Sequence, residues 1–246
     1  MTTPLLPLDS SRTSDELADA APEIALLPIG AAEQHSHHLP CSTDTLVADY
    51  ICDGIARRLP LWRLPTIPFA ISHMHRGSAG SVWVTNETLA RYIKDVVLSI
   101  RCQGVRKIVI GNFHGGNFIV RPVVQDLNRD YDDLTVILLE PEVDTSDIYD
   151  HPSTMRHAEE AETSAVLAIA PELVHMDLAR DETPPYTQSY LLYAPFHKLG
   201  KHGCWGTPTA GTAEKGRLAL QRRIDASVRF IQETFAKVDR IKSADA

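Results

Sequence analysis

The stretch EIALLPIGAAEQHSHHLPCSTDTLVADYICDGIARRL, residues 23–59, decides the fold. It opens with the continuous apolar run EIALLPIG (23–30), which is typical of a strand buried on both faces. It closes with DTLVADYICDGIARRL (44–59), where apolar residues recur at helical spacing and Thr43 or Asp44 is available as the N-cap. A buried strand followed by an amphipathic helix predicts the first unit of a parallel sheet.

The rest of the chain continues this alternation. KIVIGN (107–112) and LTVILLEP (134–141) predict two further strands, and LWRLPTIPF (61–69) predicts a proline-marked extended segment. Such alternation favours an α/β fold with a mostly parallel central sheet and helices on both faces, a three-layer αβα architecture. We expect a single domain over residues 1–246, with residues 1–20 as an irregular lead-in. The expected helices span residues 44–59, 86–104 (capped by Asn86), 115–131, 157–171 and 212–238.

The composition argues against several classes of protein. The chain has 246 residues, of which 43% are hydrophobic and 23% charged, so it is expected to fold around a core. With 24 basic and 32 acidic residues, the net charge is −8, and no basic tract is present. This balance disfavours nucleic acid and anionic membranes as partners. No secretory signal or membrane span is visible, and the four cysteines lack zinc-site spacing, so we expect a cytoplasmic location.

The strongest group of chemical residues follows the first strand. Glu33 and His35 are two positions apart, so in an extended backbone both side chains point to one side. Asp44 stands at the start of the expected helix, where the helix dipole favours an ionised carboxylate. Carboxylate and imidazole together suit Zn²⁺, Mn²⁺ or Fe²⁺. The alternative to a metal site is a solvated loop. His37 and His38 are assigned either to outer contacts of the site or to the surface.

A second group, GNFHGGN (111–117), follows the second long strand. Glycines on either side of His114 allow the backbone to pass close to a bound group, although a plain glycine-rich turn is the alternative. Because the carboxyl ends of parallel strands share one edge of a sheet, His114 is expected near the first group.

The third group, RHAEEAETS (156–164), opens a predicted helix. Acids favour helix N-termini for electrostatic reasons alone, and two of Glu159, Glu160 and Glu162 are expected to do only that. Glu162 is bracketed by alanines, so it is the acid expected to point inward, where a metal is a suitable partner. His157 stands just ahead and is placed to transfer protons.

Two further segments are less specific. ISHMHRGSAGSVW (71–83) contains His75, Arg76 and Trp83, which we assign to substrate binding, although a turn with a packed tryptophan is equally compatible. KHGCWGTPTAGTAEKG (201–216) is a glycine-rich loop that enters the last helix.

In this order, the groups resemble the signatures of the creatininase (creatinine amidohydrolase) family. The family pattern E-Q-H-G-x-H-L-P-x-x-T-D is similar to the twelve residues from Glu33 to Asp44. N-G-H-x-x-N is similar to the segment from Asn112 to Asn117, and H-A-G-x-x-E-T-S to the segment that starts at His157. Weaker likenesses cover residues 74–81 and 203–216.

The resemblance implies an αβα fold, one or two divalent ions, hydrolysis without a covalent intermediate, and a homo-oligomer, often a hexamer. It implies that Asp44 bridges the ions and that His157 is a proton shuttle or substrate contact. We add Asn117 of the second signature to the substrate-binding set. The implied metal ligands are Glu33, His35, Asp44, His114 and Glu162, of which Glu162 also counts with His157 as catalytic.

This chain departs from the family pattern at several positions. Creatininase has a metal-binding glutamate at the place of Gly116, and the family's usual glycines are replaced by Ser36 and Glu159. A common proline is replaced by His37. Creatinine is therefore not the favoured substrate.

The function expected from these residues is hydrolysis of the C–N bond of a small cyclic amide or formamide. The cation would lower the pKa of a water molecule, and the resulting metal-bound hydroxide would attack a carbonyl. Arg76 or Lys198 is available to hold one anionic group of a small-molecule substrate. The alternatives are C–C ring-opening of an oxidised inositol and a non-catalytic metal-binding scaffold.

Overall fold

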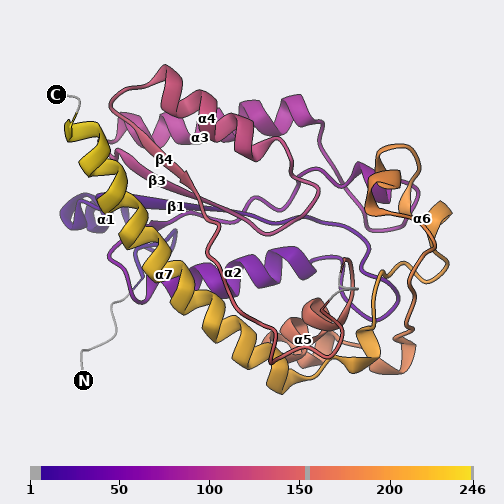
Figure 1. Cartoon of the computed structure of the whole chain (residues 1–246). Helices are drawn as coiled ribbons and strands as arrows, with labels where there is room; N and C mark the ends of the chain where they lie inside the picture. Colours follow the sequence, from indigo (N-terminus) through magenta and orange to yellow (C-terminus); the bar gives the residue numbers. More distant parts are fainter. Residues whose placement is uncertain (1–6, 153–155, 245–246) are drawn as a thin grey trace.

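The computed structural model describes residues 7–152 and 156–244, and its centre is a parallel sheet (Figure 1). The strand order is β2-β1-β3-β4, and every neighbouring pair is parallel. Three strands fall where apolar runs predicted them, and β2 is only two residues long because the prolines after it have no N–H to donate. The strands are β1 (Ile24–Ile29), β2 (Trp62–Arg63), β3 (Lys107–Asn112) and β4 (Thr135–Leu138).

Helices cover both faces of the sheet. Leu27 and its same-face neighbours in the strands pack against α3 (Asn86–Cys102) and α4 (Val120–Asp130). Leu26 and Val109 point the other way, into the core made with α2 (Thr43–Ala56) and α7 (Ala213–Ala244). Figure 1 shows these two helical layers above and below the strands. The αβα prediction is confirmed, because alternating strand residues feed two separate cores.

The remaining helices are short, and several frame the site. α5 (Glu160–Ile169) packs closely on α7. Gly216 permits this close contact, since a Cβ at its position would lie 1.9 Å from the carbonyl oxygen of Ser164. Within the part of the chain that the structure describes, the others are α1 (Ser14–Ala20), α6 (Phe196–Leu199) and the 3₁₀ turns η1 (His73–His75), η3 (Pro171–Leu173), η4 (Met176–Leu178), η5 (Gln188–Leu192) and η6 (Pro208–Ala210).

Some boundaries differ from the prediction. Residues 14–20, expected to be irregular, form α1 (Ser14–Ala20), because Thr13 and Glu16 make a capping box. The expected helix over 115–131 starts only at Val120, which places Pro122 in its first turn. Residues 1–6 of the expected lead-in lie outside the described residues.

Capping also differs at two helices. α3 is capped by the Thr85 side chain rather than by Asn86. At α2 the N-cap residue is Ser42, which makes no side-chain capping bond. None of the helices described between residues 7 and 244 has the length and apolar character that a membrane span requires.

Candidate metal centre

Acids and imidazoles meet beyond the carboxyl ends of β1 and β3. Glu33 and His35 follow β1, Asp44 lies in the first turn of α2, and His114 follows β3. Glu162 reaches the same point from the first turns of α5. The structure therefore brings together every metal ligand expected from the sequence.

The side chains form a chain of close contacts in which acids and imidazoles alternate. His35 Nε2 lies 3.6 Å from Glu162 Oε2 and 3.5 Å from Asp44 Oδ1. Asp44 Oδ2 lies 3.1 Å from His114 Nδ1, and His114 Nε2 lies 3.3 Å from Glu33 Oε2. Asp44 thus stands between two imidazoles.

These distances fit a cation. Ligands about 2.0–2.2 Å from an ion at tetrahedral or octahedral angles lie about 3.0–3.5 Å from one another. Both oxygens of Glu33, Oδ2 of Asp44 and Nε2 of His35 are buried without a hydrogen-bond partner among the described residues. A buried charged atom left unpaired is costly, and coordination of a cation would remove that cost. The residues present therefore fit a divalent ion.

Backbone carbonyls orient two of the imidazoles in their neutral form, which is the form that binds a metal. His35 Nδ1 lies 3.1 Å from the Glu33 carbonyl oxygen and donates to it, so Nε2 keeps its lone pair toward Asp44 and Glu162. His114 Nε2 donates to the Ile71 carbonyl oxygen at 2.9 Å, so its Nδ1 lone pair faces Asp44. Such hydrogen bonds fix the tautomer that a metal ligand needs.

A second arm of the cluster is built around Glu33 and Gln34. Oε1 of Glu33 lies 3.3 Å from His75 Nε2 and 3.7 Å from His157 Nδ1. His157 Nε2 donates to the Gln34 carbonyl oxygen at 2.8 Å, and the Gln34 side-chain amide donates to His75 Nδ1 at 2.9 Å. The lone pair of His157 Nδ1 is therefore turned toward the cluster, and Glu33, His75 and His157 form a second group that could hold a metal.

We call Asp44 with its neighbours His35 and His114 the Asp44 arm. Nearby carboxylates raise the pKa values of these two imidazoles. Burial by itself would lower the pKa of His35, but the carboxylates of Asp44 and Glu162 raise it to about 10. In the same way, Glu33 and Asp44 outweigh burial and raise the pKa of His114 to about 9. Burial would raise the pKa of Asp44, yet the two imidazoles hold it well below its ordinary value. A positive charge is therefore favoured beside Asp44.

The other arm shows the opposite behaviour. Burial, followed by the positive fields of His35 and His114, lowers the pKa of His75 to about 3. Burial also lowers the pKa of His157 well below its ordinary value. Burial and the neighbouring Asp44 raise the pKa of Glu33 to about 7, against the opposing effect of His114. Near neutral pH, the free imidazoles of His75 and His157 are neutral.

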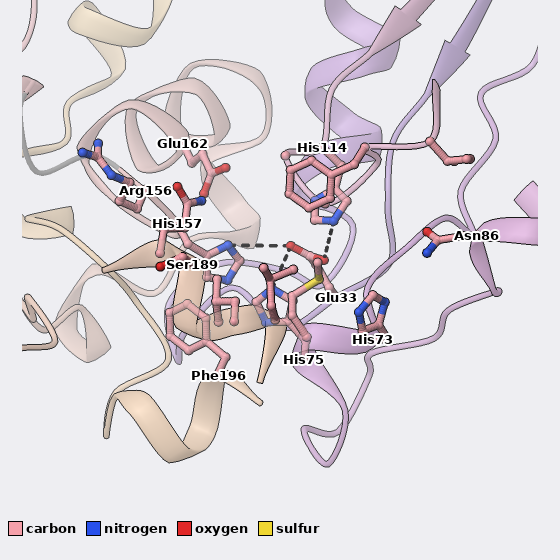
Figure 2. A pocket seen from close by; sticks show the side chains of 18 of the residues that line it. Glu33, His73, His75, Asn86, His114, Arg156, His157, Glu162, Ser189 and Phe196 are labelled. Carbon is pink, nitrogen blue, oxygen red and sulfur yellow. Dashed lines mark ion pairs between the residues drawn. The ribbon is translucent and has the colours of Figure 1, made fainter. Parts of the chain in front are cut away.

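The cluster lies at the wall of a cavity of about 930 Å³. Figure 2 shows His75, His114 and His157 pointing toward Glu33. Phe196 closes one side, with its ring stacked on His75 at 5.2 Å and tilted against His157 at 5.0 Å. The cavity is mostly apolar beyond the cluster, and its other lining residues include His73, Asn86, Phe118, Ile119, Arg156, Ser189, Leu191 and Leu192.

The remaining residues expected to bind substrate lie elsewhere. Arg76 is exposed and donates to the His73 carbonyl oxygen, Trp83 is 41% exposed, and neither lines this cavity. The Asn117 amide is occupied internally, since it accepts from the Ile71 N–H and donates to Asn112. Lys198 is exposed in α6. Only His75 of the expected substrate contacts lines the cavity.

The structure shows the surroundings of the residues whose roles the sequence left open. His37 is exposed, whereas His38 is buried and shares a 2.9 Å hydrogen bond with the Thr163 hydroxyl. Glu159 caps α5 by accepting from the N–H groups of Ala161 and Glu162. Ser36 has a φ of 61°, the left-handed conformation in which the family pattern has glycine.

Gly116 has no room for a side chain. A Cβ there would lie 2.4 Å from His114 Nε2 and 2.6 Å from the Ile71 carbonyl oxygen. A glutamate at this place is therefore incompatible with the observed position of His114. Among the acids of the cluster, Glu162 of α5 lies beside His35.

Sequence reasoning missed two contributors. Gln34 links His75 and His157, although the sequence shows it only as a polar residue between two ligands. Phe196 covers both rings from a segment that was not singled out. The aromatic run YLLYAPF (190–196) was the available signal.

Comparison with known proteins agrees with this arrangement. The sequence model of the creatininase family, described as creatinine amidohydrolase, matches residues 10–231. A mycofactocin precursor peptide peptidase of Mycobacterium ulcerans (strain Agy99) is 29% identical, covering 92% of this chain and 90% of its own. A creatinine amidohydrolase of Pseudomonas putida is 24% identical, covering 86% and 90%.

Solved structures show the same fold. A putative creatinine amidohydrolase from Bacteroides fragilis NCTC 9343 superposes with a TM-score of 0.79 at 26% identity, over 92% of this chain and 96% of that one. A structure described as creatininase Mn superposes with a TM-score of 0.77 at 21% identity, over 94% and 99%.

Proposed function

Because the chain belongs to the creatininase family, whose named members are hydrolases, we propose that it is a divalent-metal-dependent hydrolase of an amide C–N bond. One observation carries the proposal: unpartnered buried atoms of Glu33, His35 and Asp44 converge on one point, and Glu33 lines a large cavity there. Such a donor set needs a cation, and a cation beside a cavity is suited to hydrolysis.

Glu33, His35, Asp44, His114 and Glu162 would hold one or two divalent ions, with Asp44 shared. Oxygen and imidazole donors suit zinc, manganese and iron. A creatininase structure of manganese type, and another described as Zn-Zn type, support the first two. A bound ion supplies polarisation of the substrate carbonyl and a lower pKa for a water molecule.

The chain's own residues then move the proton. His157 is neutral near pH 7, lines the cavity, and has Nδ1 turned toward Glu33. It accepts a proton at Nδ1 from the attacking water and delivers it to the leaving nitrogen. The Gln34 carbonyl oxygen, which accepts from Nε2, holds the ring in this orientation. Phe196 excludes water from one side of the imidazole.

The cavity allows more than one substrate size. A small cyclic amide or formamide fits the catalytic end. A volume of about 930 Å³ with apolar residues such as Phe118 and Leu192 leaves room for a longer molecule. A peptide amide is therefore the second candidate, and the relative named as a peptide peptidase supports it.

We also propose that the chain forms a homo-oligomer. Phe118, Leu192 and Tyr193 expose 69%, 68% and 76% of their surface, which is unusual for large apolar side chains. Contact with another copy would cover them. Light scattering of the purified protein tests this, and a monomer at micromolar concentration would contradict it.

The test of function combines metal analysis with product identification. Purified protein is analysed for bound metal and then assayed with cyclic amides, formamides, short peptides and dehydro-inositols, with and without chelator. We expect an amine or ammonia plus an acid, lost with chelator and in His35→Ala but not in His37→Ala. A keto acid as the product would point to C–C cleavage instead. If the wild-type protein holds no metal and His35→Ala loses no activity, the scaffold interpretation is favoured.

A further inference from the structure

A second cavity, of about 490 Å³, lies behind the metal centre. Its walls come from α2, α5, α7 and the segment that follows β4. That segment is tied to α7, since Arg222 forms a two-pronged ion pair with Asp147. Most of its lining is apolar, and the polar members are Asn112, His114, Thr145, Tyr149, Glu162 and Arg223.

Arg223 is unusual among the charged residues of this region. It is partly buried in α7, lines the second cavity, and lines a smaller adjoining one. Across the described residues 7–152 and 156–244, no acid or hydrogen-bond acceptor pairs with its guanidinium. Two acids share a cavity lining with Arg223: Glu140 is already paired with Arg121, and Glu162 lies beside His35. The Arg223 guanidinium therefore lacks an anionic partner among the described residues.

The two large cavities meet at the catalytic cluster. His114, Gly115 and Glu162 line both of them. A group released at the cluster can therefore enter either side, and Arg223 is the only Lys or Arg that lines the second one within the described chain.

We propose that the second cavity is a carboxylate-binding site, in which Arg223 pairs with the carboxylate of a small acid. The inference rests on the proposed function in one respect: amide hydrolysis consumes water and releases an amine and an acid, so an acid is made next to this cavity. The site itself does not depend on turnover.

The chemistry favours a carboxylate over a phosphate. One guanidinium neutralises one negative charge and offers paired donors that match a carboxylate. A phosphate near neutral pH carries more charge than this single cation would balance. The apolar walls formed by Val47, Ile51, Phe113 and Leu220 suit the hydrocarbon part of an acid.

Trifluoroacetate serves as the probe, and its ¹⁹F NMR linewidth reports binding. The protein as purified and an EDTA-treated sample are titrated at constant chloride concentration. We expect concentration-dependent broadening in both samples. Arg223→Gln should weaken the affinity read from the broadening at least about 10-fold, since a charge-assisted pair of about 1.5 kcal/mol or more is lost. Arg217→Gln, an exposed arginine on the same helix, is the matched control and should behave as wild type.

The outcomes separate the explanations. Broadening that persists in Arg223→Gln, that vanishes with EDTA, or that is absent from wild type overturns the proposal. If Arg223→Gln does not fold, Ala219→Leu, which narrows the cavity and keeps the charge, must weaken binding. Acetate inhibition that Arg223→Gln relieves would identify the product acid as occupant. Arg223-dependent binding without inhibition would identify an acid from outside the reaction, and either result supports the site.

Discussion

The two arms of the catalytic cluster use the same side chains for opposite purposes. His35 and His114, beside Asp44, have pKa values raised to about 10 and about 9. His75 and His157, which both contact the Phe196 ring, have pKa values lowered by burial and by neighbouring positive charge. All four rings lie beside a buried acid, so the imidazole itself does not decide the role.

The position of the carboxylates decides it. Asp44 lies within 3.5 Å of both His35 and His114, so positive charge on that side is stabilised. His157 instead lies 3.7 Å from Glu33, whose own pKa is raised by burial, and His75 Nδ1 accepts a hydrogen bond from the Gln34 side-chain amide. In the proposed function the Asp44 arm holds the cation and His157 of the other arm moves the proton, although Glu33, His75 and His157 also lie close enough together to hold a metal.

The largest effect should come from removing the shared acid. Asp44→Asn takes away the negative charge between two ligands, and metal affinity should fall by more than about 100-fold, since losing even an outer partner costs about 10–100-fold. Turnover should fall to background. Metal content after dialysis, measured by mass spectrometry, checks this, with Asp15→Asn on exposed α1 as the control. Full metal content in Asp44→Asn would remove the distinction between the arms.

His157→Gln should separate proton transfer from metal binding. Loss of a general acid–base group lowers kcat by about 10²–10⁴-fold. Because His157 lies on the proton-moving arm, the metal content should stay at the wild-type value. Steady-state kinetics on the metal-loaded protein gives the result, and His37→Gln, exposed and outside the cluster, is the comparison. A variant that loses its metal would place His157 among the ligands.

Gln34→Leu should give a smaller loss. It removes the side-chain hydrogen bond to His75 but leaves the backbone carbonyl that orients His157. We expect kcat to fall by about 10–100-fold with unchanged metal content and a shifted pH profile, as for loss of an orienting partner. An unchanged pH profile would show that Gln34 only fills space.

The smallest effect concerns the stability of the metal-free protein. The pKa of His35 is raised from 6.5 to about 10, so its contribution to stability is present below pH 6.5 and is lost as the pH rises toward 10. The pKa of His75 is lowered to about 3, so its contribution is present above pH 6.5 and is lost as the pH falls toward 3.

Thermal unfolding of chelated protein tests both signs. The melting temperature of wild type should fall between pH 7 and pH 10, and His35→Gln should flatten that slope. His75→Gln should flatten only the acid side. A His35→Gln profile that parallels wild type throughout the alkaline range would contradict the assignment of positive charge to the Asp44 arm.

Much of the fold was accessible from the sequence. Buried parallel strands are continuous apolar runs, so β1 and β3 were predicted with errors of about one residue. The start of α4 was missed because the turn after His114 is held by Asn117, which bonds to residues 71 and 112. α1 was missed because its stability comes from a local capping box rather than from an apolar face.

Chain order and residue type by themselves determined which groups could bind a cation. These are acids and histidines directly after strands, because the carboxyl ends of parallel strands lie at the same edge of the sheet. The assignment of opposite roles to chemically equal histidines came only from the tertiary structure. A pKa depends on burial and on the distance to charges brought from remote segments, such as Asp44 beside His114 and Phe196 over His157. The same holds for Arg223, whose lack of a partner is a property of the packed chain.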